Sequence, residues 1–162
     1  HYHGKGASMD DTGLLVEELV KITTELEWIE FKVNNKDPGM IGRDISALAN
    51  SATHREASCA YMIWGVDDAT HEIVGAKFDY RSLKCGNEEI EKNEEIENWL
   101  HHQLTDNAAF KFTEGNCKGH RVVVLSIRPA FSHTVDFEHV AYIRVGSYTK
   151  PLKSYPAIEA GV

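Results

Sequence analysis

One uninterrupted apolar run lies near the middle of the chain, Cys59-Ala60-Tyr61-Met62-Ile63-Trp64-Gly65-Val66. A strand with one face in water alternates apolar and polar residues, whereas a strand buried on both faces does not. We therefore expect residues 59–66 to form a central strand of a sheet. Turn residues follow at 67–70, and Glu72-Ile73-Val74 is expected to return beside the strand as a hairpin.

The segment before this strand predicts a shorter strand and then a helix. Apolar and polar side chains alternate over residues 28–33, which gives a strand with one apolar and one polar face. Asp37 and Pro38 form a helix start signal. Apolar residues spaced i, i+4, i+7 and i+8 from Ile41 predict a helix of about 12 residues. The polar residues 51–57 are expected to form a loop.

The remaining segments complete an α+β pattern. Helices are expected from residue 11 or 12 to about residue 24 and over residues 87–104, and strands over 108–113, 121–128 and 140–145. This order predicts a two-layer α+β fold with about three helices and a mixed, mostly antiparallel sheet. Residues 9–155 are expected to form the domain. Residues 1–8 resemble an expression-tag scar, and residues 156–162 a tail or the start of a linker to a further C-terminal region.

Composition excludes several classes of function. The 162 residues contain 42% hydrophobic and 26% charged residues, as expected for one globular domain. Lys and Arg number 17 against 25 Asp and Glu, so the net charge of −8 argues against coating nucleic acid by charge alone. No apolar run is long enough for a membrane span, and no Walker motif for ATP occurs. Three cysteines without a CxxC motif favour a reducing cytoplasm.

Acidic residues bracket the two predicted strands before residue 70. Glu25 and Glu30 flank the helix-to-strand junction, Lys32 shares a strand face with Glu30, and Asp68 follows the central strand. If the two strands are neighbours, three carboxylates meet at one sheet edge, where they would suit Mg²⁺ or Mn²⁺. The alternative is ordinary, because aspartates in turns often cap the backbone and glutamates often lie on exposed strand faces.

Five motifs in order resemble the Schlafen AlbA-type domain, also called divergent AAA. They are residues 25–32 (ELEWIEFK), 45–51 (ISALANS), 64–68 (WGVDD) with 73–75 (IVG), 122–127 (VVVLSI) and 141–147 (AYIRVGS). The resemblance covers nearly all of residues 10–155. This module occurs at the N-terminus of many bacterial transcriptional regulators, which are often labelled RecG-related. The chain lacks the glycine pair that the family commonly has in the region of residues 52–58.

The resemblance implies two functions of different classes. The first is a nucleic-acid-binding module of a bacterial transcriptional regulator, with DNA favoured over RNA. The second is a metal-dependent nuclease acting on RNA or single-stranded DNA, as in Schlafen relatives that cut RNA. The three acids of those relatives correspond to Glu25, Glu30 and Asp68, with Lys32 beside the scissile phosphate. A ligand-sensing or protein-interaction module is a third possibility.

The C-terminal part of the chain carries the candidate nucleic-acid contacts. Residues 118–162 hold six cations against three acids, whereas residues 87–98 hold six glutamates and one lysine. Phosphate and base contacts are expected from Lys118, Arg121, Arg128, Arg144, Tyr148, Lys150 and Lys153, with Arg144 as the first choice for a phosphate. A homodimer and the C-terminal domains of a longer protein are further expected partners.

Overall fold

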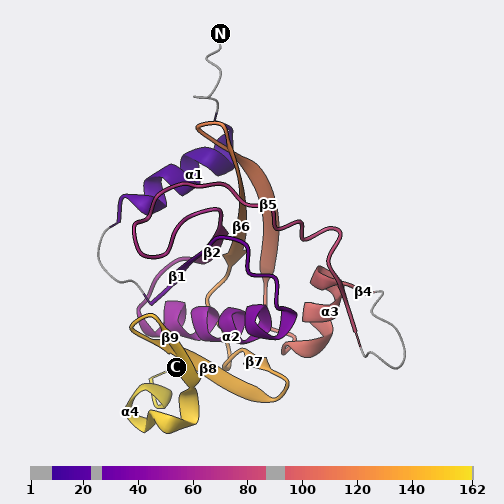
Figure 1. Cartoon of the computed structure of the whole chain (residues 1–162). Coiled ribbons are helices and arrows are strands. Elements are labelled where there is room, and N and C mark those ends of the chain that lie inside the picture. The colour runs from indigo at the N-terminus through magenta and orange to yellow at the C-terminus, as the bar shows by residue number, and fades with distance from the viewer. Residues whose placement is uncertain (1–8, 23–26, 87–93, 162) are drawn as a thin grey trace.

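The computed structural model describes residues 9–22, 27–86 and 94–161 (Figure 1). Its helices are α1 (Asp11–Val20), α2 (Pro38–His54), α3 (Ile96–Gln103) and α4 (Pro156–Glu159), with a 3-10 turn η1 (Leu152–Ser154). The strands are β1 (Ile29–Lys32), β2 (Ala60–Trp64), β3 (Lys84–Cys85), β4 (Glu94–Glu95), β5 (Phe110–Cys117), β6 (His120–Ile127), β7 (Asp136–Phe137), β8 (Val140–Val145) and β9 (Tyr148–Pro151).

The main sheet has the strand order β1-β2-β6-β5. β1 and β2 run parallel, and the other two pairs are antiparallel. A second sheet has the order β7-β8-β9, and β3 pairs with β4. The fold is therefore α+β with mixed, mostly antiparallel sheets, which confirms the sequence prediction. No helix in the described ranges is long and apolar enough to cross a membrane.

The central strand β2 is buried on both faces, as its sequence predicts. Met62 and Trp64 belong to a core formed with α2, whereas Ile63 belongs to a core formed with α1. Because both faces of the main sheet are apolar, helices cover both of them, with α1 on one face and α2 on the other. The fold therefore has more than the two layers that the sequence predicted. Figure 1 shows α2 between the main sheet and the β7-β8-β9 sheet.

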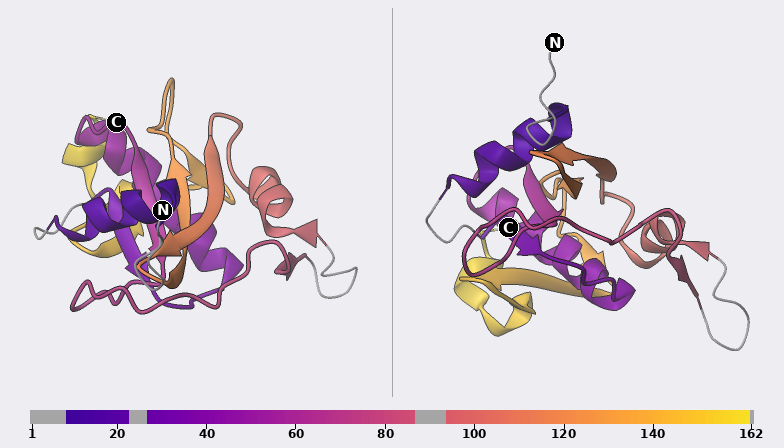
Figure 2. Two further views of the ribbon diagram at one scale, coloured as in Figure 1. Left: turned by 90° about the horizontal axis from the view of Figure 1, so that it is seen from above. Right: turned by 45° about the horizontal axis from the view of Figure 1, so that its top comes forward.

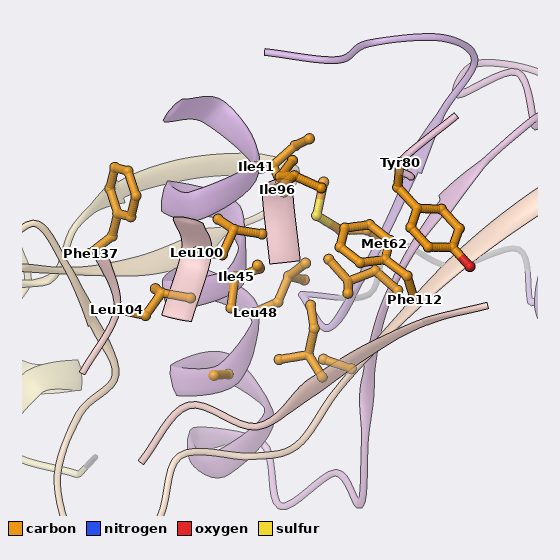
Figure 3. Close-up of a cluster of buried hydrophobic side chains, with 14 of the residues drawn as sticks. Ile41, Ile45, Leu48, Met62, Tyr80, Ile96, Leu100, Leu104, Phe112 and Phe137 are labelled. Carbon is orange, nitrogen blue, oxygen red and sulfur yellow. The ribbon is translucent and has the colours of Figure 1, made fainter. Parts of the chain in front are cut away.

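The core beside α2 gathers side chains from several elements. Ile41, Ile45 and Leu48 extend from α2 toward the sheet, and α3 contributes Ile96 and Leu100 (Figure 3). In all the views of Figures 1 and 2, α3 lies at the opposite side of the molecule from α4. The two ends of α2 therefore face different neighbours.

Helix α2 begins as predicted but ends later. Asp37 caps it by accepting a hydrogen bond from the amide of Gly39 at 3.2 Å, and Pro38 is its first residue. The expected loop at residues 51–57 is wrong, because the helix continues to His54. Its last polar residues have protein partners instead of water: the Ser51 hydroxyl accepts from the Arg144 amide, and the Thr53 hydroxyl donates to the carbonyl of Ala130.

Other elements differ from expectation mainly in extent. Helix α1 ends at Val20, and α3 covers only the second half of the predicted 87–104 helix, of which residues 87–93 lie outside the described residues. Residues 72–74, which were predicted to return as a strand, form only a single bridge, between Val66 and Ile73. Residues 148–151 form β9, for which no strand was predicted, because they pair with β8.

Candidate functional site

The polar face of β1 lies inside the protein. The side chains of Glu30 and Lys32 are only 11% and 16% exposed, since α2 and β8 cover this face. Lys32 Nζ lies 3.1 Å from Glu30 Oε2, and Arg144 Nη2 donates to Glu30 Oε1. Two residues on the same face of β1 thus form an ion pair, and β8 adds a second basic residue to it.

Asp44 of α2 completes this group. Its Oδ2 lies 3.7 Å from Lys32 Nζ, and its Oδ1 accepts a hydrogen bond from the Thr149 hydroxyl at 2.6 Å. Burial raises the pKa of Asp44, although the neighbouring cations Lys32 and Arg144 oppose that shift. We call Glu30, Lys32, Asp44, Arg144 and Thr149 the buried ion cluster; its two acids and two bases balance in formal charge.

Sequence reasoning missed two members of the buried ion cluster, Asp44 and Thr149. A signal for Asp44 was present, because it lies three residues after Ile41 and four before Leu48, within the apolar stripe of α2. A carboxylate at such a position is buried and needs a partner. Thr149 gave no comparable signal, since its role depends on the pairing of β9 with β8.

Arg144 is not a surface phosphate contact, which corrects the first choice made from sequence. It is 3% exposed, and its guanidinium is bound to Glu30 from the distant strand β1. Its Nε is buried and has no hydrogen-bond partner among the described residues. A side chain in this position cannot reach a phosphate outside the protein. Arg144 instead fastens the second sheet to the first.

Glu27 makes a second link between the chain before β1 and the β8–β9 turn. Its Oε2 accepts from the amide of Gly146 at 3.0 Å, and its Oε1 lies 2.7 Å from Nε of Arg55. The Gly146-Ser147 turn, which follows the predicted phosphate contact Arg144, is therefore held by a carboxylate.

The structure does not bring Glu30 and Asp68 together. Asp68 is exposed in the turn after β2, where Asp67 caps the backbone and the amide hydrogen bonds from Thr70 and Ala69 lower the pKa of Asp67. His71 of this turn contacts Phe31, with ring centroids 4.6 Å apart. Because Phe31 and Glu30 are adjacent in β1, their side chains lie on opposite faces of the sheet.

The proposed metal ligands are consequently not assembled by the described residues. Glu25 lies outside the described residues. Among those that the structure describes, no group of three or more His, Cys, Asp or Glu side chains could hold a metal ion. Glu30 is occupied by two cations, so the described part of the set does not fit Mg²⁺ or Mn²⁺.

Two of the predicted nucleic-acid contacts have structural partners. Lys118 lies 2.9 Å from Glu17, an ion pair that lowers the pKa of Glu17 and raises the pKa of Lys118. Arg121 donates to the carbonyls of Ala76 and Phe78 at 3.3 and 2.6 Å and lies 3.4 Å from Glu114. Both cations thus have acidic partners at the main sheet, although the Lys118 side chain is also exposed.

Four other predicted contacts are on the surface. Tyr148 is 67% exposed, with Lys150 Nζ 5.6 Å from its ring centroid, and Lys153 is exposed in η1. We call these three residues the β9 surface. Arg128 is exposed at the end of β6. Within the described ranges, no carboxylate pairs with Arg128, Lys150 or Lys153. The β5–β6 turn with Lys118 and the β9 surface lie at opposite ends of the molecule (Figure 1).

Comparisons with known proteins place this α+β domain in the nucleic-acid-related class. Residues 25–153 match the family model described as Schlafen, AlbA_2, and the chain belongs to this family. The match confirms the resemblance that the five sequence motifs indicated. It includes β1, α2 and β8, which supply four of the five members of the buried ion cluster.

A solved structure shows the same fold. The DIP2311 protein from Corynebacterium diphtheriae aligns with a TM-score of 0.54 and 13% sequence identity. The alignment covers 85% of this chain and 29% of that protein, so this chain spans less than a third of its length. A search of curated proteins finds no match.

Proposed function

We propose that this domain binds nucleic acid, with DNA preferred over RNA, as the N-terminal module of a bacterial transcriptional regulator in the cytoplasm. Further C-terminal domains would complete that regulator, and a homodimer would let two modules engage one site. The observation that supports binding is the β9 surface, where Lys150 lies beside the exposed Tyr148 ring and Lys153 follows in η1, both without an acidic partner among the described residues. Lysines neutralise phosphates, and a tyrosine ring stacks on a base or its hydroxyl bonds a phosphate.

Because the net charge is −8, binding to nucleic acid depends on where the cations lie on the surface. A chain with this charge is repelled by nucleic acid at long range, so attraction has to come from a local surface. Binding through a few lysines is strongly weakened by salt, because each neutralised phosphate releases counterions. Salt dependence therefore reports the number of phosphate contacts.

The test is fluorescence anisotropy with labelled DNA and RNA of one sequence at several salt concentrations. Removing both lysines in Lys150→Ala/Lys153→Ala should weaken binding and reduce the slope of log K against log salt by about 1.4–1.8. The matched control is Lys21→Ala/Lys118→Ala, which removes the same charge at the end of α1 and in the β5–β6 turn, from lysines that pair with Glu18 and Glu17. Equal losses in the two double variants, or no binding by the wild type, would overturn the proposal.

The metal-dependent nuclease remains a prediction of the resemblance alone, because Glu30 pairs with Lys32 and Arg144 in the structure. It is tested by incubating the protein with labelled RNA and single-stranded DNA, with and without Mn²⁺. Cleavage should need the ion and be lost in Asp68→Asn, an exposed substitution that leaves the fold intact. If the protein neither cleaves nor binds nucleic acid, a ligand-sensing or protein-interaction module becomes the better description.

A further inference from the structure

The loop between β6 and β7 exposes a phenyl ring that the fold does not use. Phe131 is 64% exposed, whereas its neighbour Ala130 is 6% exposed and belongs to the core. Leaving so much apolar surface in water is unfavourable for folding. One exposed ring is not unusual by itself, so the backbone and the side chains around Phe131 decide whether it can serve as a contact.

The backbone on both sides of Phe131 is firmly held. The amide of Ala130 donates to the carbonyl of Ala49 at 3.0 Å, and the Thr53 hydroxyl donates to the carbonyl of Ala130 at 2.6 Å. The buried Asn107 donates its side-chain amide to the carbonyls of Phe131 and His133 at 2.9 and 2.8 Å. These bonds fix the chain before, at and after the ring, so Phe131 is presented outward without loss of loop entropy on binding.

A cation stands beside the ring. Arg128, Pro129, Phe131 and Ala109 line a hollow of ≈ 630 Å³. The Arg128 amide donates to the carbonyl of Ala109 at 2.9 Å, which continues the pairing of β5 with β6 and fixes the base of the side chain. Arg128 is exposed and pairs with no acid of the described residues. The hollow thus offers an aromatic face and a positive charge.

We propose that this hollow binds one unpaired nucleotide of a single-stranded nucleic acid. The base stacks on Phe131, and Arg128 binds the adjoining phosphate. A base within a duplex has both faces covered by its neighbours, so stacking on Phe131 requires an unpaired base. The inference rests on the proposed nucleic-acid function and specifies the form of nucleic acid that is bound.

The hollow and the end of the chain that follows the β9 surface both border the C-terminal end of α2. Thr53 in the last turn of α2 bonds the Phe131 loop, and Gly161, which follows η1 and α4, lies beside His54. A strand that crosses this end of α2 meets Phe131 and Arg128 on one side and the chain after β9 on the other. Both sites are then parts of one path for the nucleic acid.

The test compares three labelled oligonucleotides of equal length by anisotropy: a single strand, its blunt duplex, and a single strand with abasic sites. Phe131→Ala should weaken single-strand binding by roughly 5- to 150-fold, which corresponds to the loss of one stacked base. Its effect on the duplex and on the abasic strand should be within twofold. Phe131→Trp should restore single-strand binding, and Arg128→Ala should weaken binding of both single strands because the phosphate is retained.

The control is Leu14→Ala, which trims another exposed apolar side chain, 48% exposed, on α1. It should bind like the wild type. If the wild type binds DNA through the β9 lysines but Phe131→Ala binds the single strand normally, this inference fails while the proposed function stands. Equal losses on single strand and duplex also overturn it. If the wild type binds no oligonucleotide, both proposals fail. The hollow would then be better explained as a site for a protein segment that contains an acidic residue.

Discussion

The pairing of Glu30 with Arg144 shows how one residue can be misread from sequence. In the sequence, Arg144 is a cation between Tyr142 and Tyr148, which is a pattern expected of a nucleic-acid contact. Its position inside the protein instead makes it the counterion of a carboxylate 114 residues earlier in the chain. A buried charge is stable only when it is paired, so the role of Arg144 follows from Glu30.

Removing Arg144 should therefore affect stability directly. In Arg144→Met, Glu30 keeps only Lys32 as a partner, and we expect the free energy of unfolding to fall by about 3 kcal/mol. Urea denaturation measures this loss. The control is Arg128→Met, because Arg128 is exposed and its replacement should change stability by less than about 0.5 kcal/mol. Equal stability of Arg144→Met and the wild type would show that the ion pair does not form in solution.

Asp44 should make stability depend on pH in an unusual direction. Because burial raises its pKa above the ordinary value of 3.8, the folded protein holds this proton more tightly than the unfolded chain does. The stability that Asp44 contributes is thus present at low pH and is lost as the pH rises above that value. Asp44→Asn cannot ionise, so it should gain stability relative to the wild type as the pH rises from about 3.5 toward 7.

The measurement is urea unfolding of both proteins across this pH range, since the difference between them cancels the other carboxylates. Asp67→Asn is the matched control with the opposite sign, because hydrogen bonds from Thr70 and Ala69 lower the pKa of Asp67. That variant should lose stability relative to the wild type as the pH rises. A free energy of unfolding for Asp44→Asn that falls relative to the wild type as the pH rises would contradict the prediction.

At the scale of elements, side chains of α2 hold the second sheet through hydrogen bonds to its backbone and to the residue before it. The Asn50 side chain accepts from the Val135 amide at 2.9 Å and donates to the carbonyls of Val135 and Tyr142 at 3.0 and 2.9 Å. The Ser46 hydroxyl donates to the Val135 carbonyl and accepts from the Tyr142 amide. These polar residues of the ISALANS motif are therefore structural, and they orient β8 and its arginine.

Close contact between α2 and β7 depends on Gly42. A Cβ added there would lie 2.2 Å from Cε1 of Phe137, which is 2% exposed and lies against Trp99. Because that ring has no free space, Gly42→Ala should lower the free energy of unfolding by about 1–3 kcal/mol. Gly39→Ala in the same helix is the control, since its Cβ would be 3.4 Å from the mobile end of Arg43. Thermal or urea unfolding distinguishes them, and equal stability of the two variants would contradict the steric argument.

At the scale of the whole molecule, formal charge is a poor guide to the surface. Of the six cations after residue 117, Lys118, Arg121 and Arg144 pair with acids, whereas Arg128, Lys150 and Lys153 pair with no acid that the structure describes. Two of these three lie near exposed aromatic rings, Arg128 near Phe131 and Lys150 near Tyr148. A chain of net charge −8 thus has small positive regions on its surface, at Arg128 and on the β9 surface.

Local chemistry was sufficient for much of the fold. The apolar run at 59–66 determined a strand buried on both faces, the alternation at 28–33 determined β1, and Asp37-Pro38 determined the start of α2. Each depends on interactions within a few residues, which the order of amino acids specifies directly. The five motifs likewise determined the family.

Only the tertiary structure decided what the polar residues do. Whether Glu30 binds a metal or an arginine, and whether Arg144 meets phosphate or Glu30, depends on which groups lie within a few ångströms. Charge interactions and hydrogen bonds act over such distances regardless of separation along the chain. The packing of β8 on α2 sets those distances here, because it buries Arg144 against β1 and leaves Tyr148, Lys150 and Phe131 in solvent.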